Sequence, residues 1–451
     1  MAKVNNFIVQ YAEILKDVKI DITDKKPPKY LFKRFVQIVK NDISEPRYEN
    51  MCTYPMETIL TTAFLGILCN ASSWSEISDV ADDNKKWLSR FVSIPNNKVP
   101  IDDTYRRVFS LIDPKELIDA TRKYLIEIFR RIKKIIDKYI NDNNINTTSI
   151  IDKNGATLIN IDGKVARGTG RFYDQNSGKK KIHNLETLNV YDASNGISLF
   201  SIPIDNKENE IPKAQEILLK MNLNKVIVTM DALHAQHKTF NIITKKHGDF
   251  LIGLKGNQGD ALEEANLTIT DEYLNKLNKE KYYKEIKDKN DNVIKMFYQV
   301  NFNNLAIDKG LTSDGTSKWS GCRNVIVYKH PNKTTGEIIT QFFVTSLNDL
   351  ETSVEAVIGR WDVENLLHRY LDISFNEDMN KTMDVNAFNN FSIMNKLCLS
   401  LLKIAKPLLG NKSMQRLRKS FSRKPVSYLF SILALVDIDV IEQAFKTIEI
   451  K

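Results

Sequence analysis

The spacing of apolar residues changes near residue 150 of this 451-residue chain, and that change constrains the fold more than any other sequence feature. From residue 30 to about residue 139, apolar side chains recur every three or four positions, as they do along one face of an α-helix. After the polar segment 141–148, short β-branched runs are mixed with helical ones, which is typical of an α/β sheet. The sequence therefore predicts an all-α N-terminal domain followed by an α/β domain.

The N-terminal part is predicted to form helices over 29–40, 56–71, 74–91, 102–112 and 115–139. Asp113 and Pro114 fit an N-cap followed by proline at the first position of the last helix. That helix has one apolar face, and its other face is either a solvated surface or a surface for DNA. The basic residues of this second face are Arg122, Lys123, Arg130, Arg131, Lys133, Lys134 and Lys138.

Composition excludes several classes of protein. With 42% hydrophobic and 27% charged residues, the chain has the balance of an ordinary globular protein. Its four cysteines show no CxxC or Cys/His ligand spacing, which argues against a zinc module or a disulfide framework. No apolar stretch reaches the roughly 18 residues needed to span a bilayer, and the first residues lack the apolar core of a signal peptide. We therefore expect a cytoplasmic protein without a membrane partner.

The net charge of +9 is unevenly distributed along the chain. Residues 403–451 carry +6 and residues 1–150 carry +4, whereas residues 151–402 carry −1. Segment 412–424 contains six Lys or Arg residues and no acid. Clustered positive charge is a favourable surface for a polyanion such as nucleic acid, so the two flanks are expected to supply salt-sensitive DNA affinity.

The α/β part is predicted to contain strands over 156–163, 183–193 and 225–232, with helices over 214–222, 237–248 and 261–269. Further strand-like runs, separated by turn residues, make 282–346 a β-rich segment. The helical period returns over 353–373 and 388–405.

Two aspartates follow apolar runs in this part of the chain. Asp162 ends the run 157–161, and Asp231 ends the run 225–230. Sites in α/β proteins are usually built at the carboxyl ends of strands, although a single such Asp more often makes a turn or caps a helix. Small and basic residues follow the first aspartate, and they would admit and neutralise a phosphate backbone. These neighbours are Gly163, Lys164, Arg167, Gly168 and Arg171.

A third candidate lies in the predicted helix 353–373. Arg360, Glu364 and His368 are four residues apart, so a cation, a carboxylate and an imidazole lie along one side of the helix. A structural salt-bridge stripe has the same spacing. Three carboxylates on two strands and a helix are also what a two-metal phosphoryl-transfer site requires, because Mg²⁺ prefers oxygen ligands. The chain contains no P-loop, GxGxxG, GxSxG or HExxH motif that would support another chemistry.

Four sequence blocks support a specific resemblance. LINIDGKVARGTGR, VIVTMDALHAQ, FLIGLKGNQGDALEE and GRWDVENLLHRYLDISFNED occur in this order along the chain. They resemble the conserved blocks of the H-repeat-associated (ISAs-type) insertion-sequence transposases, a DDE family with an RNase H-like catalytic core. Two N-terminal blocks, YPMETILTTAFLGILCNASSWSEISDVA and VPIDDTYRRVFSLIDPKEL, resemble the helical domain that accompanies this core.

The resemblance implies that Asp162, Asp231 and Glu364 are the catalytic triad and the ligands of Mg²⁺, for which Mn²⁺ can substitute. Within the matching blocks, Asn257 and Gln258 are expected to support DNA binding or the active site, and Arg360 and Asn365 flank the catalytic helix position. The full set of expected DNA contacts comprises Lys164, Arg167, Arg171, Lys255, Asn257, Gln258, Arg360, Asn365, Arg416, Arg418 and Lys419.

The predicted organisation has three parts: a helical domain over 1–148, an RNase H-like core over 149–405 and a helical basic tail over 406–451. A β-rich insertion is expected at about 275–347, inside the core. The implied activity is to bind the terminal inverted repeats of an insertion sequence, cleave there and join the 3′-OH to target DNA. The expected partners are double-stranded DNA and a second copy of the chain, and the expected location is the nucleoid.

Departures from the family pattern leave alternatives open. Val357 and Leu371 occupy positions that hold Tyr and Lys in the wider transposase group, so the sequence does not predict whether a hairpin intermediate forms. Glu377 is a rival third acid, but it lies about 220° round a continuous helix from Glu364, which is preferred. The alternative functions are a metal-dependent nuclease on the same fold, a domesticated DNA-binding protein and an α/β protein whose acids are structural.

Overall fold

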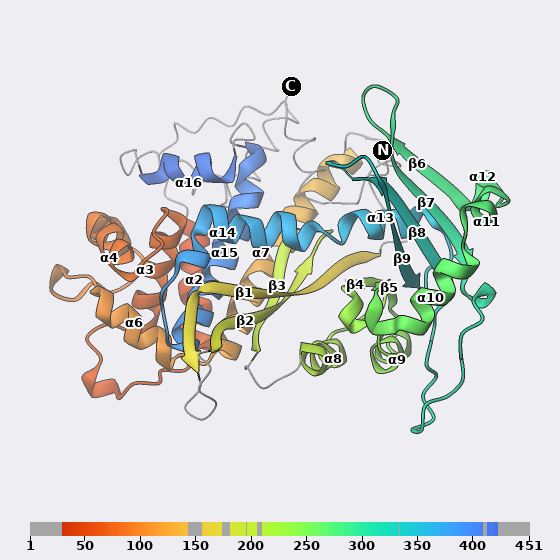
Figure 1. Cartoon of the computed structure of the whole chain (residues 1–451). Coiled ribbons are helices and arrows are strands. Elements are labelled where there is room, and N and C mark those ends of the chain that lie inside the picture. The colour runs from red at the N-terminus through yellow and green to blue at the C-terminus, as the bar shows by residue number, and fades with distance from the viewer. Residues whose placement is uncertain are drawn as a thin grey trace.

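The computed structural model describes residues 29–142, 156–173, 181–194, 196–204, 210–332, 334–408 and 413–422. Within them, nine strands form one mixed sheet in the order β3-β2-β1-β4-β5-β9-β8-β7-β6 (Figure 1). The strands are β1 (Thr157–Tyr173), β2 (Lys181–Asp192), β3 (Ile197–Ile204), β4 (Val226–Met230), β5 (Asp249–Leu254), β6 (Tyr283–Lys287), β7 (Val293–Asn301), β8 (Asn324–Pro331) and β9 (Ile338–Thr345).

The sheet has two halves that meet at β5. Strands β1, β2 and β3 pair antiparallel, and β4 and β5 continue the sheet parallel to β1. Strand β9 then pairs antiparallel with β5, and β8, β7 and β6 follow, all antiparallel. The predicted α/β class and the β-rich segment 282–346 are confirmed, and the β-rich segment extends the same sheet instead of forming a separate one.

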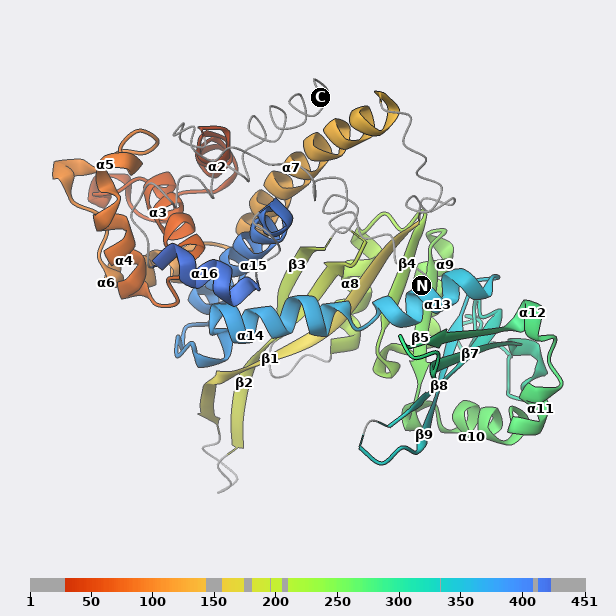
Figure 2. The ribbon, with the colours of Figure 1, turned by 90° about the horizontal axis from the view of Figure 1, so that it is seen from above.

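Strand alternation gives the sheet two covered faces. Ile159 and Ile161 of β1 belong to a core that includes residues of α8 (Glu210–Lys220) and α9 (His237–Lys245). Leu158 belongs to a second core shared with the helices that follow the insertion. Successive side chains of a strand point to opposite faces, so both cores are built on the same strands. Figure 2 shows α14 lying along β1, with α13 farther along, beside β5.

The helices after the insertion form a nearly continuous rod. They are α13 (Leu350–Gly359), η6 (Val363–His368) and α14 (Arg369–Phe375). The η6 segment is a π-helix, in which the N–H of Arg369 donates to the carbonyl of Glu364, five residues earlier. Single π-turns inside helices occur frequently at functional sites. The rod ends where Asn376 adopts a left-handed conformation at φ 54°, and the turn η7 (Glu377–Met379) follows.

The N-terminal part is helical, as predicted. Its helices are α2 (Lys29–Asp42), α3 (Met56–Leu68), α4 (Trp74–Asp83), α5 (Lys85–Leu88), α6 (Asp102–Leu111) and α7 (Pro114–Asp142). The expected helix 74–91 is interrupted at Asn84, which caps α4. Helix α7 begins at Pro114, and Asp113 Oδ1 accepts the Lys115 N–H at 2.9 Å, which confirms the predicted N-cap.

Helix α15 (Val385–Leu408) packs against α3, α6 and α7, so the N-terminal helices share one apolar core with the end of the chain. Helix α16 (Met414–Ser422) follows. On the basic face of α7, Arg122 lies over the Phe200 ring at 4.5 Å and Lys123 pairs with Asp42 at 2.6 Å. The side chains of Arg130, Arg131, Lys133, Lys134 and Lys138 lie outside the described part.

Five further helical segments of the described part lie between the end of β4 and the start of β6. They are η3 (Ala232–His234), η4 (Gly256–Gln258), α10 (Gly259–Thr268), α11 (Asp271–Asn275) and α12 (Lys279–Tyr282). None of the helices in the described part of the chain is long and apolar enough to cross a membrane.

Candidate active site

The register of two parallel strands brings the predicted aspartates together. Ile161 of β1 is paired with Met230 of β4, and the next residue on each strand is Asp162 or Asp231. The prediction that Asp162 lies just beyond a strand is wrong, because β1 continues to Tyr173 along β2. Asp162 instead marks the point where β4 ends beside β1, so both carboxylates still lie at the same edge of the parallel pair.

Asp162 carries the strongest electrostatic signature of the site. Burial, followed by the charges of Glu364, Glu210 and Asp231, raises the pKa of its carboxyl to about 7. Burial and like charge both disfavour the ionised form of a carboxyl group. Four acids therefore act on one another here, three of which were predicted from the sequence.

Asp231 combines two roles at the end of β4. Its Oδ1 accepts the Leu233 N–H at 2.8 Å, so it caps η3. Its charge also acts on Asp162 and on Arg360. The turn-capping role that a strand-end Asp often has is therefore present together with a place in the acid cluster.

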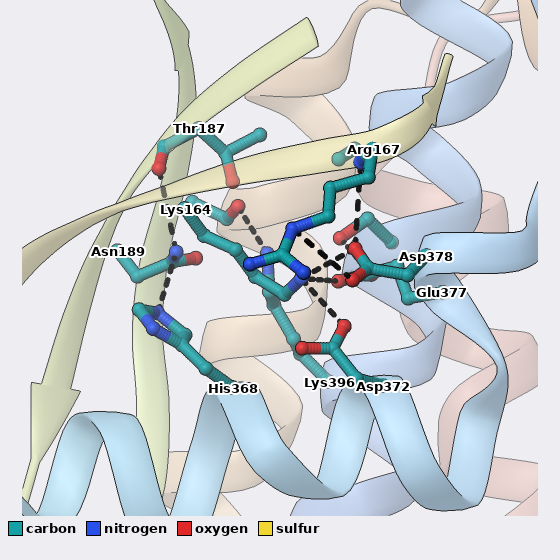
Figure 3. Close-up of polar contacts among 12 residues, drawn as sticks. Lys164, Arg167, Thr187, Asn189, His368, Asp372, Glu377, Asp378 and Lys396 are labelled. Carbon is teal, nitrogen blue, oxygen red and sulfur yellow. Dashed lines mark hydrogen bonds and ion pairs between the residues drawn. The ribbon is translucent and has the colours of Figure 1, made fainter. Parts of the chain in front are cut away.

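Glu364 lies on the π-turn of the rod and is exposed to solvent. One turn later, His368 Nδ1 lies 3.6 Å from Asp162 Oδ2. The other ring nitrogen, His368 Nε2, lies 3.2 Å from Asn189 Nδ2 (Figure 3). Asn189 is directly opposite Asp162 in the β1–β2 pair, so both side chains are on one face. Burial lowers the pKa of His368 to about 3, so the ring is neutral near pH 7.

Arg360 supplies a positive charge beside the acids. Its guanidinium lies over the rings of Trp361, at 4.1 Å, and Phe343, at 4.7 Å. Burial lowers the pKa of Arg360, while the charges of Glu364, Asp231 and Asp162 raise it. The stacked guanidinium is therefore held near the carboxylates by the protein itself.

Asn160 connects the three elements that carry the triad, and sequence reasoning missed it. Its buried Nδ2 donates to the Gly359 carbonyl at 2.7 Å, and Thr229 Oγ1 donates to its Oδ1 at 2.7 Å. Asn160 lies two residues before Asp162. The available signal was a polar residue in an apolar strand run.

Glu210 is the fourth acid, and sequence reasoning missed it as well. Its Oε1 lies 3.1 Å from His234 Nε2 on η3, and a Cβ added at Gly163 would lie 3.1 Å from its Oε2. Glu210 is the first residue of α8, with no strand pattern leading into it, so no local signal marked it.

A divalent metal fits the chemistry of these donors. Among the described residues, no group of three His, Cys, Asp or Glu side chains is already placed to hold a metal ion. The pKa of the Asp162 carboxyl is nevertheless raised, first by burial and then by the negative charges of Glu364, Glu210 and Asp231. A cation bound among Asp162, Asp231 and Glu364 would relieve that repulsion, and oxygen ligands are those that Mg²⁺ prefers.

The loop after β5 supports the segment after Asp231. Asn257 Nδ2 donates to the Ala232 carbonyl at 2.5 Å, and Gln258 Nε2 donates to the Ala235 carbonyl at 2.5 Å. Lys255 is exposed at the start of this loop. Of the two roles expected for Asn257 and Gln258, these contacts favour active-site support.

Two of the predicted DNA contacts, Lys164 and Arg418, are buried. Lys164 is 7% exposed and pairs with carboxylates of the protein, among them Asp372 at 2.6 Å. Arg418 is 1% exposed and lies over the Phe375 ring at 3.8 Å. Neither side chain faces solvent in this structure, so the expectation that they contact phosphates is wrong for this conformation.

The other predicted DNA contacts have varied exposure. Arg167, Asn365, Arg416 and Lys419 are exposed, as a DNA contact requires, and the side chain of Arg171 lies outside the described part. The two glycines near Asp162 serve the protein's own packing. A Cβ at Gly168 would lie 2.4 Å from the Asp378 carbonyl oxygen, and Gly163 faces Glu210.

Glu377, the rival third acid, belongs to a different cluster. It is 3% exposed, accepts a hydrogen bond from Ser392 at 2.5 Å and lies 3.7 Å from Lys164. Its charge is not among those that shift the pKa of Asp162, whereas that of Glu364 is. These contacts support Glu364 over Glu377 as the third acid of the site.

Comparison with known proteins identifies the family to which this fold and this acid cluster belong. The model described as "Transposase DDE domain" matches residues 153–401, and the one described as "DDE_Tnp_1-associated" matches residues 38–125. The chain belongs to the DDE transposase family, which confirms the resemblance seen in the sequence blocks.

The named relatives agree with this assignment. "Putative transposase YncI" of Escherichia coli O157:H7 is 25% identical over 87% of this chain and 92% of its own length. "H repeat-associated putative transposase YhhI" of Escherichia coli strain K12 is 25% identical over 84% of this chain and 93% of its own. A solved piggyBac transposase synaptic complex with hairpin DNA aligns at 12% identity and a TM-score of 0.37, over 95% of this chain and 82% of that one, and the family assignment does not rest on it.

Proposed function

We propose that this protein is a transposase that binds the terminal inverted repeats of its own insertion sequence, cleaves at the ends and joins the freed 3′-OH to target DNA. The observation that carries the proposal is the parallel register of β1 and β4, which places Asp162 beside Asp231, with Glu364 acting on the same group. The family assignment supports the reaction class.

The catalytic core is of the RNase H type in this proposal. Its support is the strand order β3-β2-β1-β4-β5, with the first three strands antiparallel and β4 and β5 parallel to β1. The β6–β9 segment lies between the second and third acids in the chain and extends the sheet beyond β5. Cores of this kind bring acids from two strands and a helix to one sheet edge.

The divalent metal would be held by Asp162, Asp231 and Glu364. We expect it to be Mg²⁺, for which Mn²⁺ can substitute. Such ions neutralise charge on the transferred phosphoryl group and activate the attacking oxygen. The protein's own groups position the DNA, and no covalent intermediate with the enzyme is needed. Asp162 must give up its proton to act as a ligand, and the stacked Arg360 balances part of the negative charge.

The duplex would lie over exposed basic residues around the site, with the helical flanks adding affinity. The exposed candidates are Arg167, Lys255, Arg416 and Lys419. Replacing one phosphate contact should weaken binding to all sequences similarly and lower the salt dependence by about one unit. We further propose that two copies of the chain hold the paired ends.

The test uses duplexes that contain the inverted repeats flanking the coding region, with Mg²⁺ or Mn²⁺. Wild type should nick these ends and, from a pre-nicked 3′-OH end, join it to a plasmid. Asp162→Asn, Asp231→Asn and Glu364→Gln should abolish both steps and retain DNA binding. Glu272→Gln, an acid on α11 with a 79% exposed side chain, is the control and should behave as wild type.

Three outcomes would contradict the proposal. Cleavage without any joined product would indicate a nuclease on the same fold. Binding to the ends without cleavage in either metal would indicate a domesticated DNA-binding protein. If the protein does not bind the ends and metal has no effect on it, the acids are structural.

A further inference from the structure

Three alternate residues of β1 face the rod that carries Glu364. Asn160, Asp162 and Lys164 are two positions apart, so they share one face of the strand, opposite to Ile159 and Ile161. Their partners follow the rod in the same order. Asn160 binds the Gly359 carbonyl, Asp162 lies beside His368, and Lys164 pairs with Asp372.

Lys164 is the most strongly held of the three. Its Nζ lies 2.6 Å from Asp372 Oδ1, 3.3 Å from Asp378 Oδ1 and 3.7 Å from Glu377 Oε2 (Figure 3). The lysine comes from β1, and the carboxylates come from α14 and η7. A buried charge persists when it is paired and hydrogen-bonded, so this cation links the end of the rod to β1.

The surroundings restrict movement of this junction. Glu377 accepts a hydrogen bond from Ser392, and this bond connects η7 to α15. The backbone of Asp378 approaches Gly168 of β1 so closely that a Cβ there would lie 2.4 Å from its carbonyl oxygen. On the other side of Glu364, where Asn160 binds Gly359 at the end of α13, Thr229 of β4 holds the Asn160 amide at 2.7 Å.

We propose that Asn160 and Lys164 are positioning residues that hold the rod in one register along β1 and thereby set the placement of Glu364 relative to Asp162. One contact lies before Glu364 in the rod and the other lies after it. A slide of one helical turn is about 5.4 Å, which would remove Glu364 from the acid cluster. The role in catalysis rests on the proposed function, but the register itself does not.

The test compares Lys164→Met with Asp372→Asn, the double variant and Lys164→Arg in the full chain. Mn²⁺ alone is the probe, measured by calorimetry, and binding of the inverted-repeat duplex is measured in parallel. Lys164→Met should weaken Mn²⁺ binding about tenfold, the low end for a residue that orients ligands, while duplex affinity changes less than about twofold. Lys164→Arg should restore most of the Mn²⁺ affinity.

The double variant separates positioning from a general loss of charge. If Lys164 acts through Asp372, the double variant should bind Mn²⁺ no more weakly than Lys164→Met alone. Arg167→Gln is the matched control on the same strand, since the Arg167 side chain is 84% exposed. It should keep Mn²⁺ affinity and weaken duplex binding.

Two outcomes would overturn the proposal. One is a loss of Mn²⁺ affinity in the double variant equal to the sum of the two single losses. The other is a loss of duplex affinity in Lys164→Met as large as that in Arg167→Gln. If Lys164→Met does not fold, Thr229→Val removes the bond that supports Asn160, and Asp372→Asn weakens the contact of the rod with Lys164; the two contacts lie on opposite sides of Glu364. Both should then weaken Mn²⁺ binding, and unchanged affinity in both would refute the positioning role. A wild type that binds Mn²⁺ but does not cleave DNA would refute the proposed function and leave this test intact.

Discussion

Replacing Arg418 by alanine should destabilise the fold without removing a direct DNA contact. The guanidinium donates to the carbonyls of Ser374, Ile67, at 2.9 Å, and Ala71, at 3.4 Å. It also stacks on Phe375 at 3.8 Å. The side chain therefore joins the end of α14 to the end of α3. Alanine would remove this donor from all three carbonyls, of which Ile67 keeps the Asn70 N–H at 3.2 Å.

The change in the free energy of unfolding is the difference between the interactions that are lost and the desolvation cost that is removed. Each buried carbonyl left without a partner costs about 1–3 kcal/mol, and the loss of the cation–π contact costs up to about 2 kcal/mol. Removing a buried cation returns several kcal/mol of desolvation free energy. Burial lowers the pKa of Arg418 to about 10, so the group is still charged near pH 7. We expect a net loss of about 3 kcal/mol in the free energy of unfolding.

The assay is urea unfolding followed by tryptophan fluorescence, with Arg416→Ala as the control. Arg416 is exposed on the same helix, two residues away, so its loss should leave the urea midpoint within error and weaken duplex binding. Arg418→Ala should show the reverse pattern under conditions in which it remains folded. An unchanged urea midpoint together with weakened duplex binding in Arg418→Ala would refute the reasoning and restore this residue as a DNA contact.

Three further predictions concern the acids of the site. The folded pKa of Asp162, about 7, lies above its ordinary value of 3.8, so the stability from its protonated form is present below about pH 4 and is lost as pH rises to about 7. Asp162→Asn should therefore raise the stability of the metal-free protein at pH 8, on the order of 2 kcal/mol, but not at pH 4; equal urea midpoints at pH 8 would contradict this. Glu364→Gln should abolish cleavage, whereas Glu377→Gln should lower the free energy of unfolding by about 1–2 kcal/mol and retain cleavage; the opposite result would make Glu377 the third ligand. Glu210→Gln removes one negative neighbour, so the midpoint of Mn²⁺ binding against pH should move down by about half a unit, and an unmoved midpoint would place Glu210 outside the site.

Local patterns in the sequence predicted much of the fold correctly. The N-terminal helices, the start of α7 at Pro114, and most of the strands follow from the apolar period and from capping residues. These features depend on neighbours within about one or two helical turns, so they are readable without the tertiary structure. Strand β3 (Ile197–Ile204) was not predicted, since its apolar run contains a proline, which weakens the strand signal.

The predictions that failed concern burial. Lys164 and Arg418 were taken as exposed because Lys and Arg usually are, but each is covered by a segment distant in the chain. Asp162 was placed after a strand because the apolar run stops there, whereas β2 keeps β1 extended to Tyr173. Sequence alone does not reveal which distant element covers a residue.

The sequence by itself determined the family, the class of fold and the three acids expected to carry the chemistry. The tertiary structure decided how those acids are held. Asn160 reaches Gly359 across 199 positions, and Lys164 reaches Asp372 across 208. It also brought Glu210 to the site as a fourth acid. Helix and strand patterns are set by neighbours along the chain, whereas these contacts exist only after the sheet has paired and the rod has packed along β1.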